Sequence, residues 1–250
     1  MTIDPGYWQP TIERRGDKIV PTYARGAIKC KPAAPTVNNT DTIAMTDEST
    51  IDFRGGPFAP GASPEADGSP EIEFEISEYG YPIDLMFGDD DDHVTAGVVE
   101  DRSIGVNFNP SQADIDADIL LISEELDYAN VTIHAGGGDD LIDAGGGPGC
   151  APKTKVSIGY LFGDAGNDTL IGTDDFDTIE GGGGTDEIDS RKKADLIRTR
   201  DKSSDVVACG SGRDTLYRDR RDRGTDCEHN YLPGQEPPEP KPPHIPGLHP

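Results

Sequence analysis

Aspartate recurs at a fixed interval in the middle of the chain. Asp168, Asp177 and Asp186 follow one another at intervals of nine residues, and an aliphatic residue stands two positions after each. Carboxylates stacked in this way repel one another, more strongly where water is excluded. A hard divalent cation with about six to eight oxygen ligands removes that repulsion, and calcium fits better than magnesium, which requires a small octahedral cage. The spacing therefore predicts calcium binding.

Glycine-rich turns around these aspartates supply further oxygen ligands. Glycine allows positive φ angles, so a turn built from it can expose its carbonyl oxygens to an ion. The predicted metal-site residues are Gly163, Asp164, Gly166, Asp168, Gly181, Gly182, Gly184, Asp186, Gly136, Gly138, Asp140 and Asp177.

A nine-residue unit has room for one very short strand and one turn. Leu170, between Thr169 and Ile171, suits a strand. Two units then make a coil with a strand on each side, and coils stack about 4.8 Å apart. A fixed period of this kind is typical of a calcium-binding parallel β-helix. We therefore expect an all-β fold, a parallel β-roll or β-solenoid, in which Asp168 lies beside Asp186.

At these residues the chain resembles the hemolysin-type (RTX) calcium-binding repeat family. Residues 163–171 and 181–189 carry the resemblance, and residues 135–143 share it in part. It weakens at 172–177, where expected glycines are missing and Phe176 is unusual. The resemblance implies a right-handed parallel β-roll that binds calcium between successive turns.

Composition and patterning divide the chain into five regions. They are a loosely ordered arm at 1–40, N-terminal β-strands with degenerate repeats at 41–130, the calcium-binding β-roll at 131–189, metal-free basic coils that cap the roll at 190–230, and a proline-rich tail at 231–250. Strict alternation predicts a half-buried strand at 71–76. Further short strands are expected at 50–53, 106–108, 119–122 and 131–133. The strands before residue 131 would extend the roll or cap it.

Residues 87–94 look like a degenerate repeat, with Asp92 and Val94 in the aspartate and aliphatic positions. Their carboxylates beside His93 also allow a zinc site, because His and carboxylates can both ligate zinc. The alternatives are a solvated acidic turn and a further calcium turn.

Basic residues replace the turn glycines after residue 189, although the spacing continues with Asp195, Asp205 and Asp214. Residues 190–228 contain eleven Lys and Arg against eight Asp and Glu. We expect these side-chain cations to neutralise the stacked aspartates in place of a metal. Nucleic-acid contact is the weaker alternative, because aspartates are interleaved and no aromatic platform accompanies the cations.

Four cysteines without CxxC spacing argue against a structural zinc site. Cys209 and Cys227 are eighteen residues apart, one full coil, which brings their Cα atoms into disulfide range. Cys30 and Cys150 form a second candidate pair on parity alone. Two unpaired buried thiols are the alternative.

The formal charge of −26 disfavours nucleic acid and anionic membranes and favours cations. No stretch approaches the roughly 18 apolar residues of a membrane span, and no secretory signal is visible at the start. Calcium sites of modest affinity operate outside the cell, so we expect an extracellular protein with an unidentified macromolecular partner. A halophilic surface would explain the acidity but not the nine-residue spacing.

The sequence contains neither the His-Glu-x-x-His pattern of zinc proteases nor a Gly-x-Ser-x-Gly nucleophile turn. We expect a calcium-binding protein without catalytic activity that Ca²⁺ folds or stiffens. The alternatives are an extracellular adhesin, matrix or surface-display protein, and a fragment of a larger secreted RTX-type enzyme or toxin.

Overall fold

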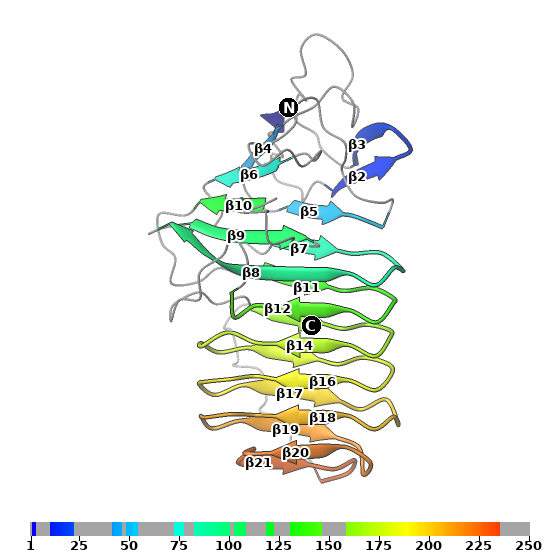
Figure 1. The fold of residues 1–250 in the computed structure, drawn as a ribbon, viewed down its shortest axis with the longest axis vertical. Coiled ribbons are helices and arrows are strands. Elements are labelled where there is room, and N and C mark those ends of the chain that lie inside the picture. The colour runs from blue at the N-terminus through cyan, green and yellow to red at the C-terminus, as the bar shows by residue number, and fades with distance from the viewer. Residues whose placement is uncertain are drawn as a thin grey trace, which may run out of the picture.

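The computed structural model describes residues 2–3, 11–22, 42–46, 49–54, 73–77, 83–100, 103–108, 119–122, 131–146 and 159–235. Short strands stack in two sheets along a tall roll, with β2 near one end and β21 at the other (Figure 1). Every regular element in the described residues is a β-strand, and none of these residues forms a helix long and apolar enough to cross a membrane.

One face of the roll is an eleven-stranded sheet. In spatial order its strands are β1 (Thr2–Ile3), β4 (Thr42–Thr46), β6 (Glu73–Ser77), β10 (Ile119–Ile122), β9 (Ser103–Phe108), β8 (His93–Glu100), β12 (Leu141–Asp143), β14 (Thr169–Ile171), β16 (Glu187–Asp189), β18 (Val206–Ala208) and β20 (Arg223–Thr225).

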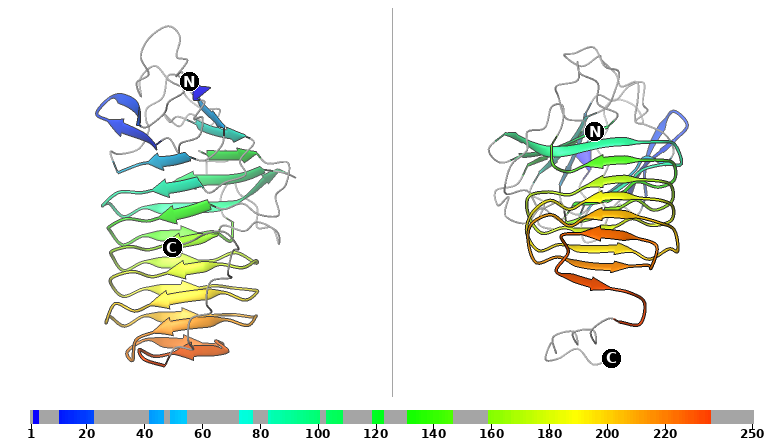
Figure 2. Two further views of the ribbon diagram at one scale, coloured as in Figure 1. Left: turned by 180° about the vertical axis from the view of Figure 1, so that it is seen from behind. Right: turned by 60° about the horizontal axis from the view of Figure 1, so that its bottom comes forward.

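The opposite face is a ten-stranded sheet. Its order is β21 (His229–Tyr231), β19 (Thr215–Arg218), β17 (Leu196–Thr199), β15 (Thr178–Glu180), β13 (Tyr160–Phe162), β11 (Val131–His134), β7 (Ile83–Met86), β5 (Ser49–Asp52), β2 (Thr11–Arg15) and β3 (Lys18–Thr22). Figure 2 shows the two faces from behind and tilted, with the turns aligned along both edges.

The chain alternates between the two sheets, so that a strand pairs in parallel with the strand one coil later. Leu170 is paired with Ile188, eighteen residues on, as the repeat predicts. Ile142 is paired with Leu170, so the longer coil between them also keeps register. The three-residue strands β12, β13, β14, β15, β16 and β18 each bury their central side chain completely or nearly so. Since each of these strands buries one aliphatic side chain, the core is one aliphatic layer thick on each face. Burial of one such residue contributes only about 1.5–3 kcal/mol.

The N-terminal half departs from a strictly parallel roll. β8 pairs antiparallel with β9, and β9 pairs antiparallel with β10. The strands expected at 50–53 and 71–76 are β5 and β6, and they extend the two sheets.

Residues 11–22 form the antiparallel hairpin β2–β3, with Gly16 at positive φ in its turn. The expectation that they belong to a loosely ordered arm is therefore wrong. Ile12 and Ile19 are buried in the hairpin, and neither belongs to an alternation of apolar and polar residues that would reveal a strand in the sequence.

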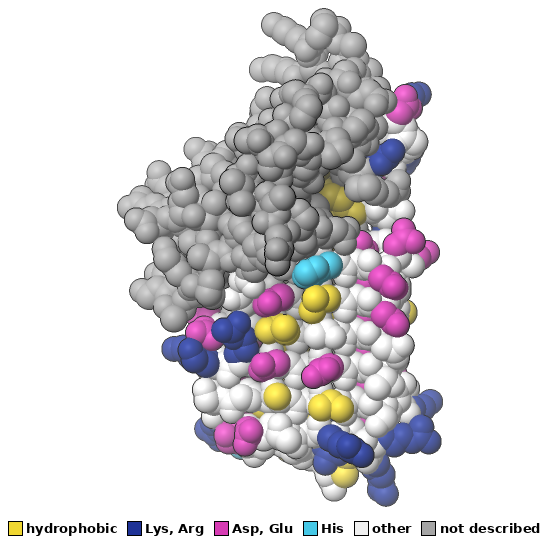
Figure 3. Space-filling view, in the orientation of Figure 1, with side chains coloured by type: hydrophobic (Ala, Val, Ile, Leu, Met, Phe, Trp, Pro, Cys, Tyr) yellow, Lys and Arg dark blue, Asp and Glu magenta, His cyan; other side chains and the backbone are white. Residues whose placement is uncertain are grey.

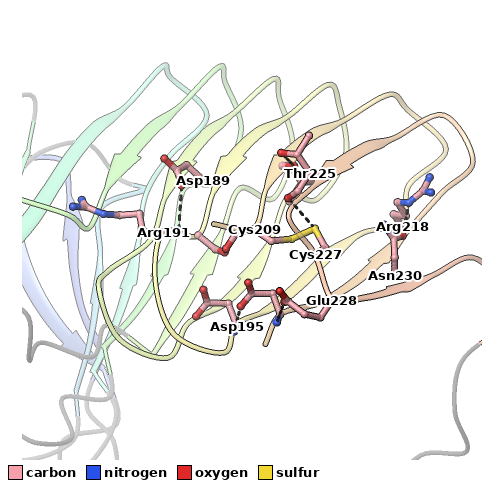
Figure 4. The surroundings of a disulfide bond; sticks show 12 residues. Asp189, Arg191, Asp195, Cys209, Arg218, Thr225, Cys227, Glu228 and Asn230 are labelled. Atoms are coloured by element: carbon pink, nitrogen blue, oxygen red, sulfur yellow. Dashed lines mark hydrogen bonds between the residues drawn. A yellow bond between two sulfur atoms is a disulfide. The ribbon is translucent and has the colours of Figure 1, made fainter. Parts of the chain in front are cut away.

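The C-terminal end of the roll is closed by a change of residue type. Gly224 pairs with Val207 and Asn230 with Leu216, so both aliphatic layers end there. Cys209 and Cys227 form a disulfide with Cα atoms 5.2 Å apart, as their spacing predicts (Figure 4). Cys30, Cys150 and the proline-rich segment after residue 235 lie outside the described residues.

Candidate metal centre

The aspartates of the repeat fall on two different edges of the roll. The first edge is the stack of turns that lead into β8, β12, β14, β16 and β18. These turns are residues 87–92, 135–140, 163–168, 181–186 and 200–205. We call second edge the stack of turns 172–177, 190–195 and 209–214, which lead into β15, β17 and β19.

Along the first edge, each aspartate holds the backbone of the coil before it. The amide N–H of Asp140 donates to Asp168 Oδ1 at 2.9 Å, and that of Asp168 donates to Asp186 Oδ1 at 3.0 Å. Asp92 and Asp205 extend the ladder in the two directions, at 2.7 and 3.0 Å. The predicted contact between Asp168 and Asp186 is therefore present.

The second oxygen of each of these carboxylates lacks a partner. The side chains are almost completely buried, and Oδ2 accepts no hydrogen bond in Asp140, Asp168, Asp186 or Asp205. Buried polar atoms in native proteins are nearly always paired, so an orphaned one points to a missing ligand or ion. The row of free oxygens suits a hard cation.

Burial and neighbouring carboxylates disfavour the charged form of these groups. Burial, followed by repulsion from Asp140 and Asp186, raises the pKa of Asp168 to about 7. Burial also raises the pKa of Asp140 to about 6 and that of Asp205 to about 7. A positive charge bound beside them would offset this cost.

Gly163 leaves open the space that these oxygens face. A Cβ at this residue would lie 2.5 Å from Asp168 Oδ2 and would collide with the Gly181 carbonyl oxygen. Because no real side chain tolerates such contacts, glycine keeps a carboxylate and a carbonyl oxygen from adjacent coils facing one space. Together they fit the oxygen-only ligand set of calcium.

The remaining predicted glycines line the same edge. A Cβ at Gly166 would collide with Gly138 O, and one at Gly184 with Gly166 O. Gly136, Gly138 and Gly182 also have positive φ and approach the turn before them. The Asp164 carboxylate instead faces His134, 3.2 Å from Nδ1, and this pairing raises the pKa of His134.

Asp177 occupies the same repeat position and has a different environment on the second edge. The Thr173 amide donates to its Oδ2 at 2.8 Å, and the Thr173 hydroxyl lies 3.0 and 3.1 Å from its two oxygens. Both oxygens therefore have protein partners, and we do not assign Asp177 to a metal site. In the sequence, the one sign that Thr173 could be a partner of Asp177 is its position in a turn that lacks an expected glycine.

The basic side chains that replace turn glycines do not contact the aspartate columns. Arg191 and Lys192 pair with Asp174 at 3.3 and 2.6 Å, and Lys193 lies over the Phe176 ring. In the face shown in Figure 3, Lys and Arg side chains gather toward the C-terminal coils. Within the described residues, no Lys or Arg forms an ion pair with Asp195, Asp205 or Asp214. The expectation that Lys and Arg side chains neutralise these three aspartates is therefore wrong.

No group of three or more His, Cys, Asp or Glu side chains is gathered to hold a metal among the residues that the structure describes. The zinc alternative at His93 gains no support from this arrangement. A cation between two first-edge turns would thus take at most two carboxylates and complete its ligand shell with backbone oxygens, which is calcium chemistry.

Comparison with protein families identifies the repeat. Residues 128–148 and 162–197 match the RTX calcium-binding nonapeptide repeat in four copies. These turns are similar to RTX repeats. The match includes the turns 135–140, 163–168 and 181–186, in which the orphaned oxygens and turn glycines occur together. No curated protein and no solved structure matches the chain.

Proposed function

We propose that this protein is a calcium-binding β-roll that Ca²⁺ folds or stiffens, without catalytic activity, in an extracellular setting. The observation that carries the proposal is the row of buried, unpartnered Oδ2 atoms in Asp140, Asp168 and Asp186 beside RTX turns. A bound ion supplies the positive charge that these carboxylates lack.

The chain's own residues provide the coupling between binding and folding. The Oδ1 ladder ties each coil to the next, while the free Oδ2 atoms leave uncompensated negative charge between the same coils. The ladder needs the coils stacked, and the charge opposes their stacking, so cation binding and coil stacking favour each other.

Two observations support the remaining parts of the proposal. The disulfide Cys209–Cys227 suits an oxidising compartment. In the described residues, the buried carboxylates belong to the turn columns, apart from Asp52, which pairs with Arg54. The proposal assigns the column carboxylates to cation binding and not to acid–base chemistry.

The test is circular dichroism of the full chain during a calcium titration, with magnesium as the control. We expect the β-sheet signal to rise cooperatively with calcium at about 10⁻⁴–10⁻³ M, the range of extracellular calcium modules. Magnesium at the same concentration should have little effect. A spectrum that does not respond to calcium would refute the coupling of binding and folding.

A further inference from the structure

The turns at the C-terminal end of the first edge differ in charge from the turns before them. The turns 87–92, 135–140, 163–168 and 181–186 contain no Lys or Arg. The turns 200–205 and 219–222, which we call the basic turns, lead into β18 and β20. In and beside them stand the cations Arg200, Lys202, Arg218, Arg220, Arg221 and Arg223. Aspartates also occur in the basic turns, so the charge of this surface depends on where the side chains point.

The aspartates of the basic turns are engaged within the protein. Asp205 and Asp222 are buried. Asp201 Oδ2 and Asp219 Oδ2 each accept a hydrogen bond from a backbone amide of the preceding first-edge turn, at 3.0 and 2.6 Å. These carboxylates therefore pair with the backbone or lie in the interior, and they do not pair with the cations of the same turns.

The cations of the basic turns are exposed. Within the described part of the chain, Lys202, Arg220 and Arg223 form no ion pair with a carboxylate. The exposed Arg221 donates from Nη1 to the Lys202 carbonyl oxygen at 3.0 Å, which holds its side chain without neutralising it. Figure 3 shows Lys and Arg side chains gathered at the C-terminal end of the roll. The basic turns thus present a positive surface on a chain whose formal charge is −26.

Two tyrosines border this surface on the outer face of the ten-stranded sheet. Tyr217 of β19 and Tyr231 of β21 stack with their ring centroids 5.4 Å apart. The guanidinium groups of Arg198 and Arg200 lie 5.9 and 5.2 Å from the centroid of the Tyr217 ring. A guanidinium held against a ring directs its N–H groups sideways, in its own plane, where an oxyanion can bind them. The expectation that no aromatic platform accompanies these cations is therefore wrong.

Arg218 joins the tyrosine face to the basic turns. Its Nε donates to Asn230 Oδ1 on the last coil, and Figure 4 shows the two side chains together. Its Nη1 donates to the carbonyl oxygens of Asp219 and Asp222, each at 3.0 Å. These contacts hold the turn 219–222 against β19 and β21. A ligand would meet a surface that is already ordered, so it would lose less affinity to ordering the protein.

The groups on this surface indicate the chemistry of its ligand. Arginine suits carboxylates and similar oxyanions, which it binds through paired N–H donors. Glu180 is paired with Arg198 in the sheet and offers a carboxylate acceptor beside it. A polysaccharide with uronate sugars supplies both carboxylates for the arginines and hydroxyl donors for Glu180. A nucleic-acid strand, with a phosphate about every 3.4 Å, would bring a denser negative charge against Glu180 and fewer hydroxyl donors.

We propose that the basic turns, with the neighbouring face of β17 and β19, bind an acidic polysaccharide. Its carboxylates accept hydrogen bonds from the arginines, and its hydroxyl groups donate to Glu180. The RTX match ends at residue 197, so all the cations of this surface lie outside it. The proposal adds a ligand to the proposed function and does not rest on it.

The test is isothermal titration calorimetry of a hyaluronan oligosaccharide, in which uronate and neutral sugars alternate, into the full chain at saturating calcium. Arg220→Gln combined with Arg223→Gln should weaken binding about tenfold, because charge-assisted hydrogen bonds are lost. Lys192→Gln combined with Lys193→Gln is the matched control, because it removes the same charge from the second edge. This control should leave the affinity unchanged.

A comparison of ligands on the unmodified chain needs no variant. Esterified hyaluronan, which lacks the negative charge, should not bind, and oligothymidylate should bind more weakly than hyaluronan. Three results would each overturn the proposal: no binding of hyaluronan, equal losses in the two double variants, or tighter binding of oligothymidylate.

Circular dichroism of the same samples during calcium addition reports on the proposed function separately. A chain that responds to calcium but does not bind hyaluronan refutes the polysaccharide surface and leaves the proposed function standing. A chain that binds hyaluronan but does not respond to calcium refutes the coupling of calcium binding to folding and supports the surface.

Discussion

Asp168 and Asp177 are neighbours in the repeat and stand on opposite edges of the roll. Both are buried at the same repeat position, yet Asp168 keeps one oxygen without a partner and Asp177 has both oxygens paired with Thr173. The comparison teaches that a buried carboxylate in this fold can be satisfied in two ways. On the second edge, the carboxylate of Asp177 accepts hydrogen bonds from a hydroxyl and an amide of its own turn. On the first edge, the unpartnered oxygen of Asp168 leaves room for an external cation.

The largest expected effect is the pH dependence of the calcium-free protein. Burial raises the folded-state pKa of Asp140, Asp168 and Asp205 from 3.8 to about 6, 7 and 7. Each group therefore contributes stability that is fully present below pH 3.8 and is lost as the pH rises through its folded pKa. The unfolding free energy without calcium should fall between about pH 4 and 7, as measured by urea denaturation.

Saturating calcium is the control for that experiment, because a cation binds the ionised carboxylates and competes with their protons. The calcium-bound protein should gain stability over the same pH range. A calcium-free protein whose stability is flat or rises between pH 4 and 7 would show that these carboxylates are not buried as described.

Glycine on the first edge offers the next largest effect. Gly184→Ala places a Cβ against Gly166 O at a φ of +141°, so we expect it to lower the unfolding free energy of the calcium-loaded protein by about 3 kcal/mol. Gly183→Ala is the matched control in the same turn, since a Cβ there would lie 3.9 Å from its nearest neighbour, Asp164 O. Equal effects of the two substitutions in thermal unfolding would contradict the close stacking of the turns.

Thr173 provides the corresponding test of the second edge. Thr173→Val removes the hydroxyl and keeps the side-chain shape, which should destabilise the protein by about 1–3 kcal/mol with and without calcium. Thr173→Ser retains the hydroxyl and should preserve most of the stability. A loss that disappears when calcium is added would mean that an ion can take over the role of this hydroxyl.

The smallest effect is expected at the exposed ion pair between Lys192 and Asp174. The Lys192 ammonium lowers the pKa of Asp174, but the lysine side chain is 58% exposed. Lys192→Met should therefore cost less than about 1 kcal/mol in urea denaturation. High salt should reduce the difference in unfolding free energy between the variant and the unmodified protein further. A larger loss that does not depend on salt would mean that this ion pair stabilises the second edge more than an exposed pair should.

The sequence was sufficient for the features that depend on spacing. The nine-residue interval predicts the strands, the parallel register, the contact of Asp168 with Asp186 and the disulfide Cys209–Cys227, because each follows from stacking identical coils. The hairpin at residues 11–22 was missed because its two buried isoleucines are seven residues apart in a polar segment and match no period.

Side-chain direction was the other feature that spacing does not encode. A lysine or arginine in a turn can point toward the aspartate column or away from it, and Arg191 and Lys192 point to Asp174. The same limit applies to Thr173, whose pairing with Asp177 depends on the local turn conformation. Sequence therefore located the aspartates, and only the structure separated those that have protein partners from those that do not.

The most direct measurement of the central claim is isothermal titration calorimetry of Asp168→Asn and Asp177→Asn side by side with the unmodified chain. The two substitutions make the same chemical change at the same repeat position on opposite edges. We predict that Asp168→Asn loses bound calcium and that Asp177→Asn binds as many ions as the unmodified protein. Equal losses in both variants, or none in Asp168→Asn, would contradict the account.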